Sequence, residues 1–134
     1  MAAARFINPP TLAKAPGYTH TIEVTGPGRL IYIAGQLGTD LSGQVVAADF
    51  RSQAVQTWEN VKAALAAADA RMEDLIKINI YVVDLTAHLA DMRAVREQYL
   101  NMKAPPASTA VGVTALARPG ALIEIEGVAA LPAR

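Results

Sequence analysis

The 134-residue chain has no cysteine, which excludes disulfides, thiol nucleophiles and thiolate metal sites. Aromatic residues are also scarce, at 5% of the chain against 52% hydrophobic residues, so alanine, valine, isoleucine and leucine must build the core. Neither sign of charge is in excess, because twelve basic and twelve acidic side chains give a formal net charge of zero. A basic surface for nucleic acid or for an anionic membrane is therefore not expected.

Long apolar runs are missing as well. No stretch approaches the roughly 18 apolar residues of a membrane-spanning helix, and MAAARFINPP at the start lacks the apolar centre of a secretory signal. The expected location is the cytosol. The length fits one domain over residues 1–134 with a core of its own, and a net charge near zero favours association between copies.

The apolar pattern predicts a two-layer α+β fold in the order ββ-α-β-α-ββ. Residues 1–17, which contain Asn8-Pro9-Pro10, are expected to form a loosely held arm. The predicted strands are Tyr18–Val24, Arg29–Gln36, Leu75–Val83, Ser108–Val113 and Leu122–Val128, and the predicted helices run over Asp49–Ala68 and from about Asp84 to Tyr99. The first two strands, joined by a turn at Thr25–Gly28, are expected to pair antiparallel, and the last two to form a hairpin. One mixed sheet would then carry both helices on one face, and its uncovered face favours burial against another subunit.

The last predicted strand carries two carboxylates on one face. Ile123 and Ile125 alternate with Glu124 and Glu126, which is typical of a half-buried strand. If the carboxylate face points to water, the two glutamates form a solvated edge. If it points into a groove or a subunit interface, a carboxylate there can hold or activate a ligand.

Two arginines and one tyrosine leave similar alternatives open. Arg93 and Arg96 are three residues apart on the second helix and share a face. They form either a solvated helix surface beside Glu97 or an anion clamp, since guanidinium groups suit carboxylates. Tyr18 follows a Pro-Gly pair and is either a hydrogen-bonding pocket residue or an ordinary aromatic at a strand end.

The remaining candidates favour structural roles. His20 and His88 lack the spacing of metal ligands and are interpreted as structural or surface residues, so no metal is expected. Trp58 lies near the apolar stripe of the first helix and is interpreted as a packing anchor. Gly26-Pro27-Gly28 joins two strands and does not open a helix, so phosphate binding is not expected there.

Short segments spread over nearly the whole chain match, in order and spacing, the motifs of a known family. They are Pro16-Gly17-Tyr18, Ile33-Ala34-Gly35-Gln36, Gln53–Leu65, Leu75–Asp84, Val95–Tyr99, Pro106-Ala107-Ser108-Thr109 and Ile123-Glu124-Ile125-Glu126. On these segments the chain resembles the reactive intermediate deaminase family, also called the Rid or YjgF family. The resemblance implies a chorismate-mutase-like α+β fold and a homotrimer with a ligand pocket at each subunit interface. Active members hydrolyse 2-imino or 2-enamino acids to 2-oxo acids and ammonia, without a metal or cofactor.

The resemblance also assigns roles to residues. Glu124 matches the glutamate that helps to place or activate water, and Tyr18 and Gly35 match residues that line the pocket. The family's Pro-x-Arg-Ser/Thr motif binds the substrate carboxylate through its arginine, but here Ser108 stands at that position. A serine offers one neutral donor in place of a charged fork. Arg96 occupies a pocket-facing helix position that the family usually fills with a smaller polar residue.

Two hypotheses follow for ligand recognition. Either Arg96 supplies the cation from the other wall, or Ser108 and Thr109 donate hydrogen bonds to a ligand without a carboxylate. The predicted function is hydrolysis of an imine-like or enamine-like metabolite, with altered or weak activity on 2-imino acids. The alternative is a non-catalytic metabolite-binding or chaperone-like trimer. RNA cleavage, known for some relatives, is disfavoured because the chain has no basic excess.

Overall fold

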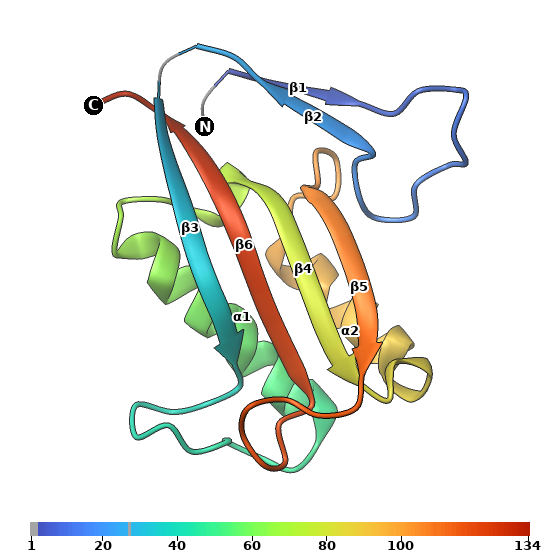
Figure 1. Ribbon diagram of the computed structural model, residues 1–134, viewed down its shortest axis with the longest axis vertical. Coiled ribbons are helices and arrows are strands. Elements are labelled where there is room, and N and C mark those ends of the chain that lie inside the picture. The colour runs from blue at the N-terminus through green and yellow to red at the C-terminus, as the bar shows by residue number, and fades with distance from the viewer. Residues whose placement is uncertain (1–2, 27) are drawn as a thin grey trace.

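The computed structural model of the protein describes residues 3–26 and 28–134. Its elements follow in the order β1 (Ala4–Ile7), β2 (Thr21–Val24), β3 (Gly28–Leu37), α1 (Phe50–Ala66), the 3-10 turn η1 (Met72–Asp74), β4 (Leu75–Val83), α2 (Leu85–Tyr99), β5 (Ala107–Val113) and β6 (Ile123–Pro132). Four strands form a mixed sheet in the order β3-β6-β4-β5, and both helices cover one face of it (Figure 1). The predicted two-layer α+β fold is confirmed, with β1 and β2 forming a separate small sheet.

The predicted C-terminal hairpin is wrong. β6 pairs antiparallel with both β3 and β4, while β5 pairs parallel with β4 on its far side. The chain reaches β5 from β4 through α2, and such a crossover brings the second strand back parallel to the first. β4 therefore separates β5 from β6, and the long apolar β6 becomes a central strand.

The N-terminal predictions also need correction. The arm is not loose throughout, because β1 pairs antiparallel with β2, with Phe6 opposite Ile22. β2 begins at Thr21 and pairs with β1, whereas β3 pairs with β6. Asn8-Pro9-Pro10 ends β1 rather than preventing it, and the Asn8 side chain accepts a hydrogen bond from the backbone N–H of His20 at 2.8 Å. Residues 1 and 2 of the predicted arm, and Pro27 of the predicted turn, lie outside the described residues.

The helices form where the sequence predicts them. The Asp49 carboxylate accepts a hydrogen bond from the backbone N–H of Ser52 at 2.9 Å, which caps α1 and lowers the pKa of Asp49. Trp58 is 1% exposed and stacks on Tyr99 of α2, with ring centroids 5.9 Å apart, so its predicted role as a packing anchor is confirmed. Within residues 3–26 and 28–134, no helix combines the length and apolarity needed to cross a membrane.

A buried glutamine ties two loops to the start of α1. Gln53 Nε2 donates to the carbonyl oxygens of Ala47 and Gly120, both at 2.9 Å, and its Oε1 accepts from the backbone N–H of Leu122 at 2.8 Å. The side chain is fully buried, so these bonds satisfy groups that water does not reach. This arrangement fixes the position at which β6 begins.

Candidate functional site

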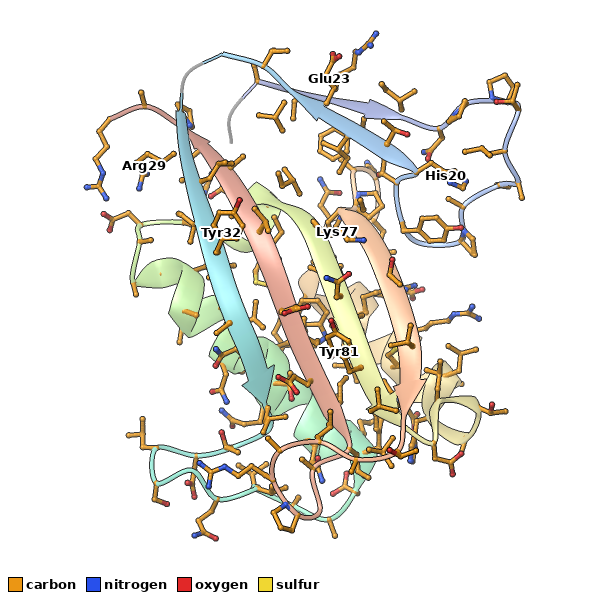
Figure 2. All side chains as sticks on the ribbon, viewed as in Figure 1. His20, Glu23, Arg29, Tyr32, Lys77 and Tyr81 are labelled. Carbon is orange, nitrogen blue, oxygen red and sulfur yellow. The ribbon has the colours of Figure 1, made fainter. Side chains whose placement is uncertain are left out.

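The sheet face that points away from the helices carries the predicted carboxylates. β4 and β6 are in register so that Tyr81 lies opposite Glu124 and Asn79 opposite Glu126. Their neighbours in the sequence, Ile78, Ile80, Ile123 and Ile125, are buried on the helix side. We call the outward side the open face. Figure 2 shows Tyr32, Lys77 and Tyr81 on this face, with the helices behind the sheet.

The two glutamates on the open face differ in their surroundings. Glu126 Oε1 accepts hydrogen bonds from Tyr81 Oη at 2.5 Å and from Asn79 Nδ2 at 3.2 Å. Glu124 makes no hydrogen bond or ion pair with any other side chain that the structure describes. Burial raises the pKa of Glu124, and the negative charge of Glu126 raises it further. Glu124 is therefore the carboxylate whose oxygens are left for water or a ligand.

Gly35 makes room for this carboxylate. The register of β3 against β6 shifts between Ile33 and Gln36, and Gly35 lies within that irregularity. A Cβ atom at Gly35 would lie 1.8 Å from Glu124 Oε2 and 2.7 Å from its Cδ. Only a glycine lets the Glu124 carboxylate lie this close to the backbone of β3. The structure thus brings together two residues that the sequence predicted for the site.

The other predicted residues lie elsewhere, in a cleft at the outer edge of β5. Ser108 is in register with the buried Ile78 of β4, so its side chain points to the helix side. The cleft has a volume of about 190 Å³ and lies between α2, β5 and the segment 16–18. Its polar lining consists of Tyr18, Arg93, Arg96 and Ser108, and its apolar lining includes Leu85, Leu89, Met92 and Ala110. We call it the edge cleft.

The segment that carries Tyr18 is anchored to the start of β5. The Thr19 hydroxyl donates to the carbonyl of Pro105 at 2.5 Å, and the Thr19 backbone N–H donates to the carbonyl of Pro106 at 3.3 Å. The Tyr18 ring meets the ring of His20 edge to face, with centroids 5.2 Å apart. These contacts hold Tyr18 over the edge cleft, so the pocket interpretation of Tyr18 is favoured.

The histidines fill structural roles, as their spacing predicted. His20 Nε2 lies 2.7 Å from the carbonyl oxygen of Ala13. The His88 ring stacks on Phe50 with centroids 4.5 Å apart and an interplanar angle of 5°. In the part of the chain that the structure describes, no three histidine, aspartate or glutamate side chains converge as a metal site would require.

Arg96 is a buried charged residue of the edge cleft. Arg96 is 5% exposed, and its Nε is fully enclosed. Among the described residues, its guanidinium has no hydrogen-bond or ion-pair partner. Burial lowers the pKa of Arg96, the charge of Glu97 raises it and the charge of Arg93 lowers it. A solvated helix surface is therefore wrong for Arg96, although Arg93 beside it is exposed.

One chain does not bring all predicted residues together. Thr109 accepts a hydrogen bond from Lys77 Nζ at 3.1 Å on the open face, where Glu124 and Gly35 also lie. Ser108, Tyr18 and Arg96 lie on the other side of the sheet. The period-two alternation of a strand could have separated Ser108 from Thr109 at once. Tyr81 and Asn79 were missed, although they alternate with buried isoleucines in the same way.

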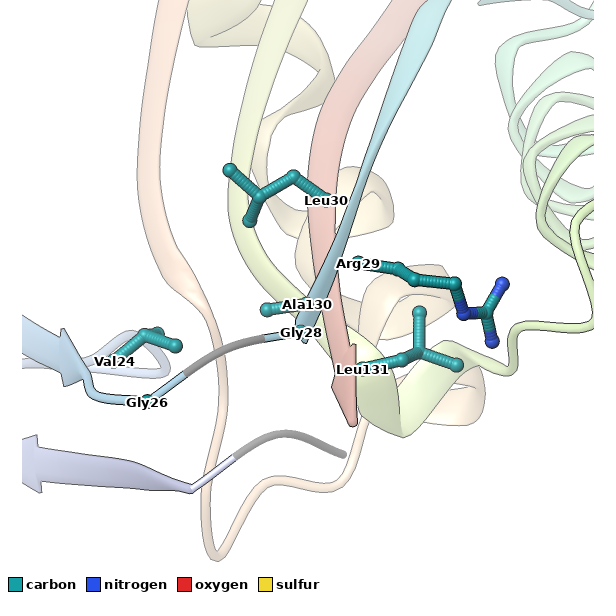
Figure 3. A pocket seen from close by; sticks show the side chains of 7 residues that line it. All are labelled: Val24, Gly26, Gly28, Arg29, Leu30, Ala130 and Leu131. Atoms are coloured by element: carbon teal, nitrogen blue, oxygen red, sulfur yellow. The ribbon is translucent and has the colours of Figure 1, made fainter. Parts of the chain in front are cut away.

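A larger cavity of about 400 Å³ lies at the start of β3, away from these residues. It is lined by Val24, Gly26, Gly28, Arg29, Leu30, Ala130 and Leu131 (Figure 3). Its one charged side chain, Arg29, donates through Nη1 to the carbonyl of Ala68 at 3.0 Å. The described lining offers neither a carboxylate nor a hydroxyl group, so this cavity is not a candidate for catalysis.

Comparisons with known proteins find similar sequences and structures over most of the chain. The family model described as Endoribonuclease L-PSP matches residues 10–131. A RutC family protein of Pyrococcus horikoshii is 38% identical over 103 residues, which is 76% of this chain and 79% of the relative. A human protein named 2-iminobutanoate/2-iminopropanoate deaminase is 36% identical over 125 residues, 87% of this chain and 85% of the relative. The crystal structure of a Yersinia pestis protein, described as a member of the conserved Rid family with unknown function, matches with a TM-score of 0.84 and 35% identity, covering 96% of this chain and 98% of that one.

Proposed function

Because the chain belongs to the endoribonuclease L-PSP family, which includes the Rid proteins, we propose that it hydrolyses a small imine or enamine in a pocket between subunits. The observation that carries the proposal is the Glu124 carboxylate, which lies against Gly35 with its oxygens unengaged by the described residues. The human relative named for deamination of 2-imino acids supports the reaction class. The reaction needs no metal and no organic cofactor, and the proposed location is the cytosol.

The reaction is an addition of water followed by loss of ammonia. Glu124 holds a water molecule and accepts its proton while the water oxygen adds to the C=N carbon. With the imine nitrogen protonated, this addition gives a neutral amino alcohol. Glu124 returns its proton to the nitrogen, the C–N bond breaks while the hydroxyl gives its proton to Glu124, and a carbonyl compound and ammonia leave. A carboxylate with a raised pKa suits this role, because it both accepts and returns a proton more readily near neutral pH.

The division of the site between two faces supports an assembly. A ligand can contact both Glu124 and the edge cleft only if the cleft of one copy meets the open face of another. The open face has the apolar surface for such contact, since Tyr32 is 75% exposed and Leu30 is 58% exposed. We therefore propose a homotrimer in which each interface joins Glu124 and Gly35 of one copy to Ser108 and Tyr18 of the next.

Ser108 sets the expected substrate preference. It gives the cleft a neutral donor at the position where the family motif has an arginine, so β5 itself supplies no cation for a substrate carboxylate. Tyr18 supplies a second neutral hydroxyl, and Thr109 contributes to the wall on the open face. Activity on 2-imino acids through the motif position is expected to be weak.

The test is hydrolysis of freshly generated 2-iminopropanoate, followed by release of ammonia and of the 2-oxo acid. We expect the wild type to exceed the buffer rate and Glu124→Gln to lose at least about 100-fold in kcat, the usual contribution of a positioned acid or base. Glu126→Gln is the matched control, with a smaller loss, because Glu126 is bonded to Tyr81 and Asn79. Ser108→Arg places an arginine at the motif position. If the wild type and Ser108→Arg both bind the 2-oxo acid but neither hydrolyses the imine, the protein is a non-catalytic binding protein and not the proposed enzyme.

A further inference from the structure

We infer that the edge cleft is an anion site in which Arg96, on α2, binds the carboxylate of a short apolar ligand. This anion site would bind the acidic group of the proposed substrate. Hydrolysis of the bound ligand rests on the proposed function, whereas binding of the anion does not. In this site a helix residue carries the charge that Ser108 does not supply from β5.

The charge of Arg96 is uncompensated within the described residues. A buried guanidinium is costly unless an anion or a set of hydrogen-bond acceptors compensates for the lost water. In residues 3–26 and 28–134, no acceptor or carboxylate lies within bonding distance of the Arg96 guanidinium, and its Nε is enclosed without a partner. The charged groups that act on it are Glu97 and Arg93, which are exposed on its own helix. An anionic ligand in the cleft would provide the missing partner.

The backbone at Gly17 leaves space for the Arg96 guanidinium. A Cβ atom at Gly17 would lie 2.3 Å from Arg96 Nη2 and 3.1 Å from Cζ, so a larger residue would displace this group. Gly17 also has a φ of +90°, which few other residues adopt without strain. The segment that contains Gly17 is tied to β5 through Thr19. The chain is thus folded over Arg96 and holds it at the cleft, where Arg93 adds a second positive charge.

The size and lining of the edge cleft restrict the kind of ligand that fits. The volume of about 190 Å³ is roughly that of six water molecules, so the part of the ligand that lies in the cleft of one copy has about six or seven heavy atoms. Leu89, Met92 and Ala110 line the cleft and favour a short aliphatic chain over a sugar or a nucleotide. A guanidinium fork pairs with a carboxylate through two parallel hydrogen bonds. The chemistry of the cleft therefore favours a short aliphatic carboxylic acid, and the C=N group of such a ligand is required only by the proposed hydrolysis.

The experiment measures binding of 2-oxobutanoate to the full-length protein by titration calorimetry, with 2-oxobutanamide as the neutral analogue and inorganic phosphate as a competing anion. We expect the Kd of 2-oxobutanoate to rise about 10-fold to 100-fold in Arg96→Gln, as for loss of a charge-assisted hydrogen bond. The amide should bind weakly, and its Kd should be the same in the wild type and in Arg96→Gln. Arg118→Gln is the matched control, because Arg118 is exposed and lies outside the cleft.

Three results would overturn the inference: an unchanged Kd in Arg96→Gln, an amide that binds as tightly as the acid, or phosphate that binds more tightly than the acid. Arg96→Met is a second variant that separates loss of binding from loss of folding. Because it removes an unpaired buried charge, its thermal unfolding midpoint should be unchanged or higher than that of the wild type. Arg96-dependent binding without turnover would refute the hydrolysis and keep the anion site. Turnover that depends on Glu124 but not on Arg96 would refute the anion site and keep the hydrolysis.

Discussion

The substitution Gly35→Ala should separate activity from stability. The new Cβ would lie 1.8 Å from Glu124 Oε2, 2.7 Å from Cδ and 3.1 Å from Cγ. Because non-bonded heavy atoms rest at roughly 3.5 Å, the carboxylate must swing away by between about 1 and 2 Å. Gly35 does not have a positive φ, so the alanine adds no backbone strain of that kind.

The expected magnitudes differ for the two properties. A side chain forced off its rotamer lowers the free energy of unfolding by about 0.5 to 1.5 kcal/mol. Alanine also reduces the conformational entropy of the unfolded chain relative to glycine, which offsets about 0.4 to 1 kcal/mol of this loss. The free energy of unfolding should therefore fall by no more than about 1 kcal/mol. Misplacement of a catalytic group by about 1 Å costs on the order of 100-fold in rate, so kcat should fall by that factor or more.

Three measurements check this expectation: kcat for C=N hydrolysis, urea denaturation, and an NMR titration of the Glu124 carboxyl carbon. The pKa of Glu124 should fall towards its ordinary value, because the displaced carboxylate leaves the burial that raises it. In a Glu124→Ala background, Gly35→Ala should have no cost in stability from this clash, since the opposing side chain is gone. An unchanged kcat alongside a displaced carboxylate would refute the role of Glu124, and a loss above about 3 kcal/mol would show that the backbone takes up the clash.

Other substitutions test the core, the loops and the pH dependence. Trp58→Ala should lower the free energy of unfolding by about 3 to 5 kcal/mol, because Trp58 is 1% exposed, and urea denaturation measures the loss. Gln53→Leu should cost about 2 to 4 kcal/mol by the same assay, since it leaves two carbonyls and one N–H without their partner; a loss below about 1 kcal/mol would mean that water replaces the side chain. Because the pKa of Glu124 is raised, the folded state binds a proton at this carboxyl more tightly than the unfolded state does. The stability that this proton contributes to the wild type is present below the ordinary pKa of glutamate and is lost as the pH rises through the raised pKa. Glu124→Gln should therefore gain thermal stability relative to wild type between pH 4 and pH 8, and an equal difference at both pH values would contradict the shift.

The local elements could be predicted from the sequence because short-range physics determines them. Asp49 caps α1, the strand Leu75–Val83 has the predicted bounds, and Trp58 packs where the apolar stripe of the helix places it. Each of these features depends on residues within one or two turns of helix or along one strand. The uncovered sheet face also followed from the element order, because two helices cover only one side.

Strand pairing could not be predicted in the same way. Both wrong hairpins joined strands that are neighbours in the sequence, whereas β6 pairs with β3 and β4 from the far end of the chain. Residues 127–131 of β6 are small or apolar on both faces of the strand, which is more typical of a central strand than of an edge strand. That composition was the available signal for a central β6, and proximity in sequence concealed it.

The burial of Arg96 depends on still longer-range contacts. The pattern of α2 places Arg96 nearer the apolar stripe than Arg93, because Arg96 lies four residues after Met92 and three before Tyr99, but the pattern does not show what covers it. Gly17 lies against the Arg96 guanidinium, and the segment that contains Gly17 is held there by Thr19, which bonds to a carbonyl 86 residues away. The sequence of β5 shows that this strand contributes no cation, but it does not reveal a cation that folding brings to the same cleft from α2. For this reason the substrate charge must be inferred from the assembled cleft, and substituting Arg96 is a sharper test of it than substituting Ser108.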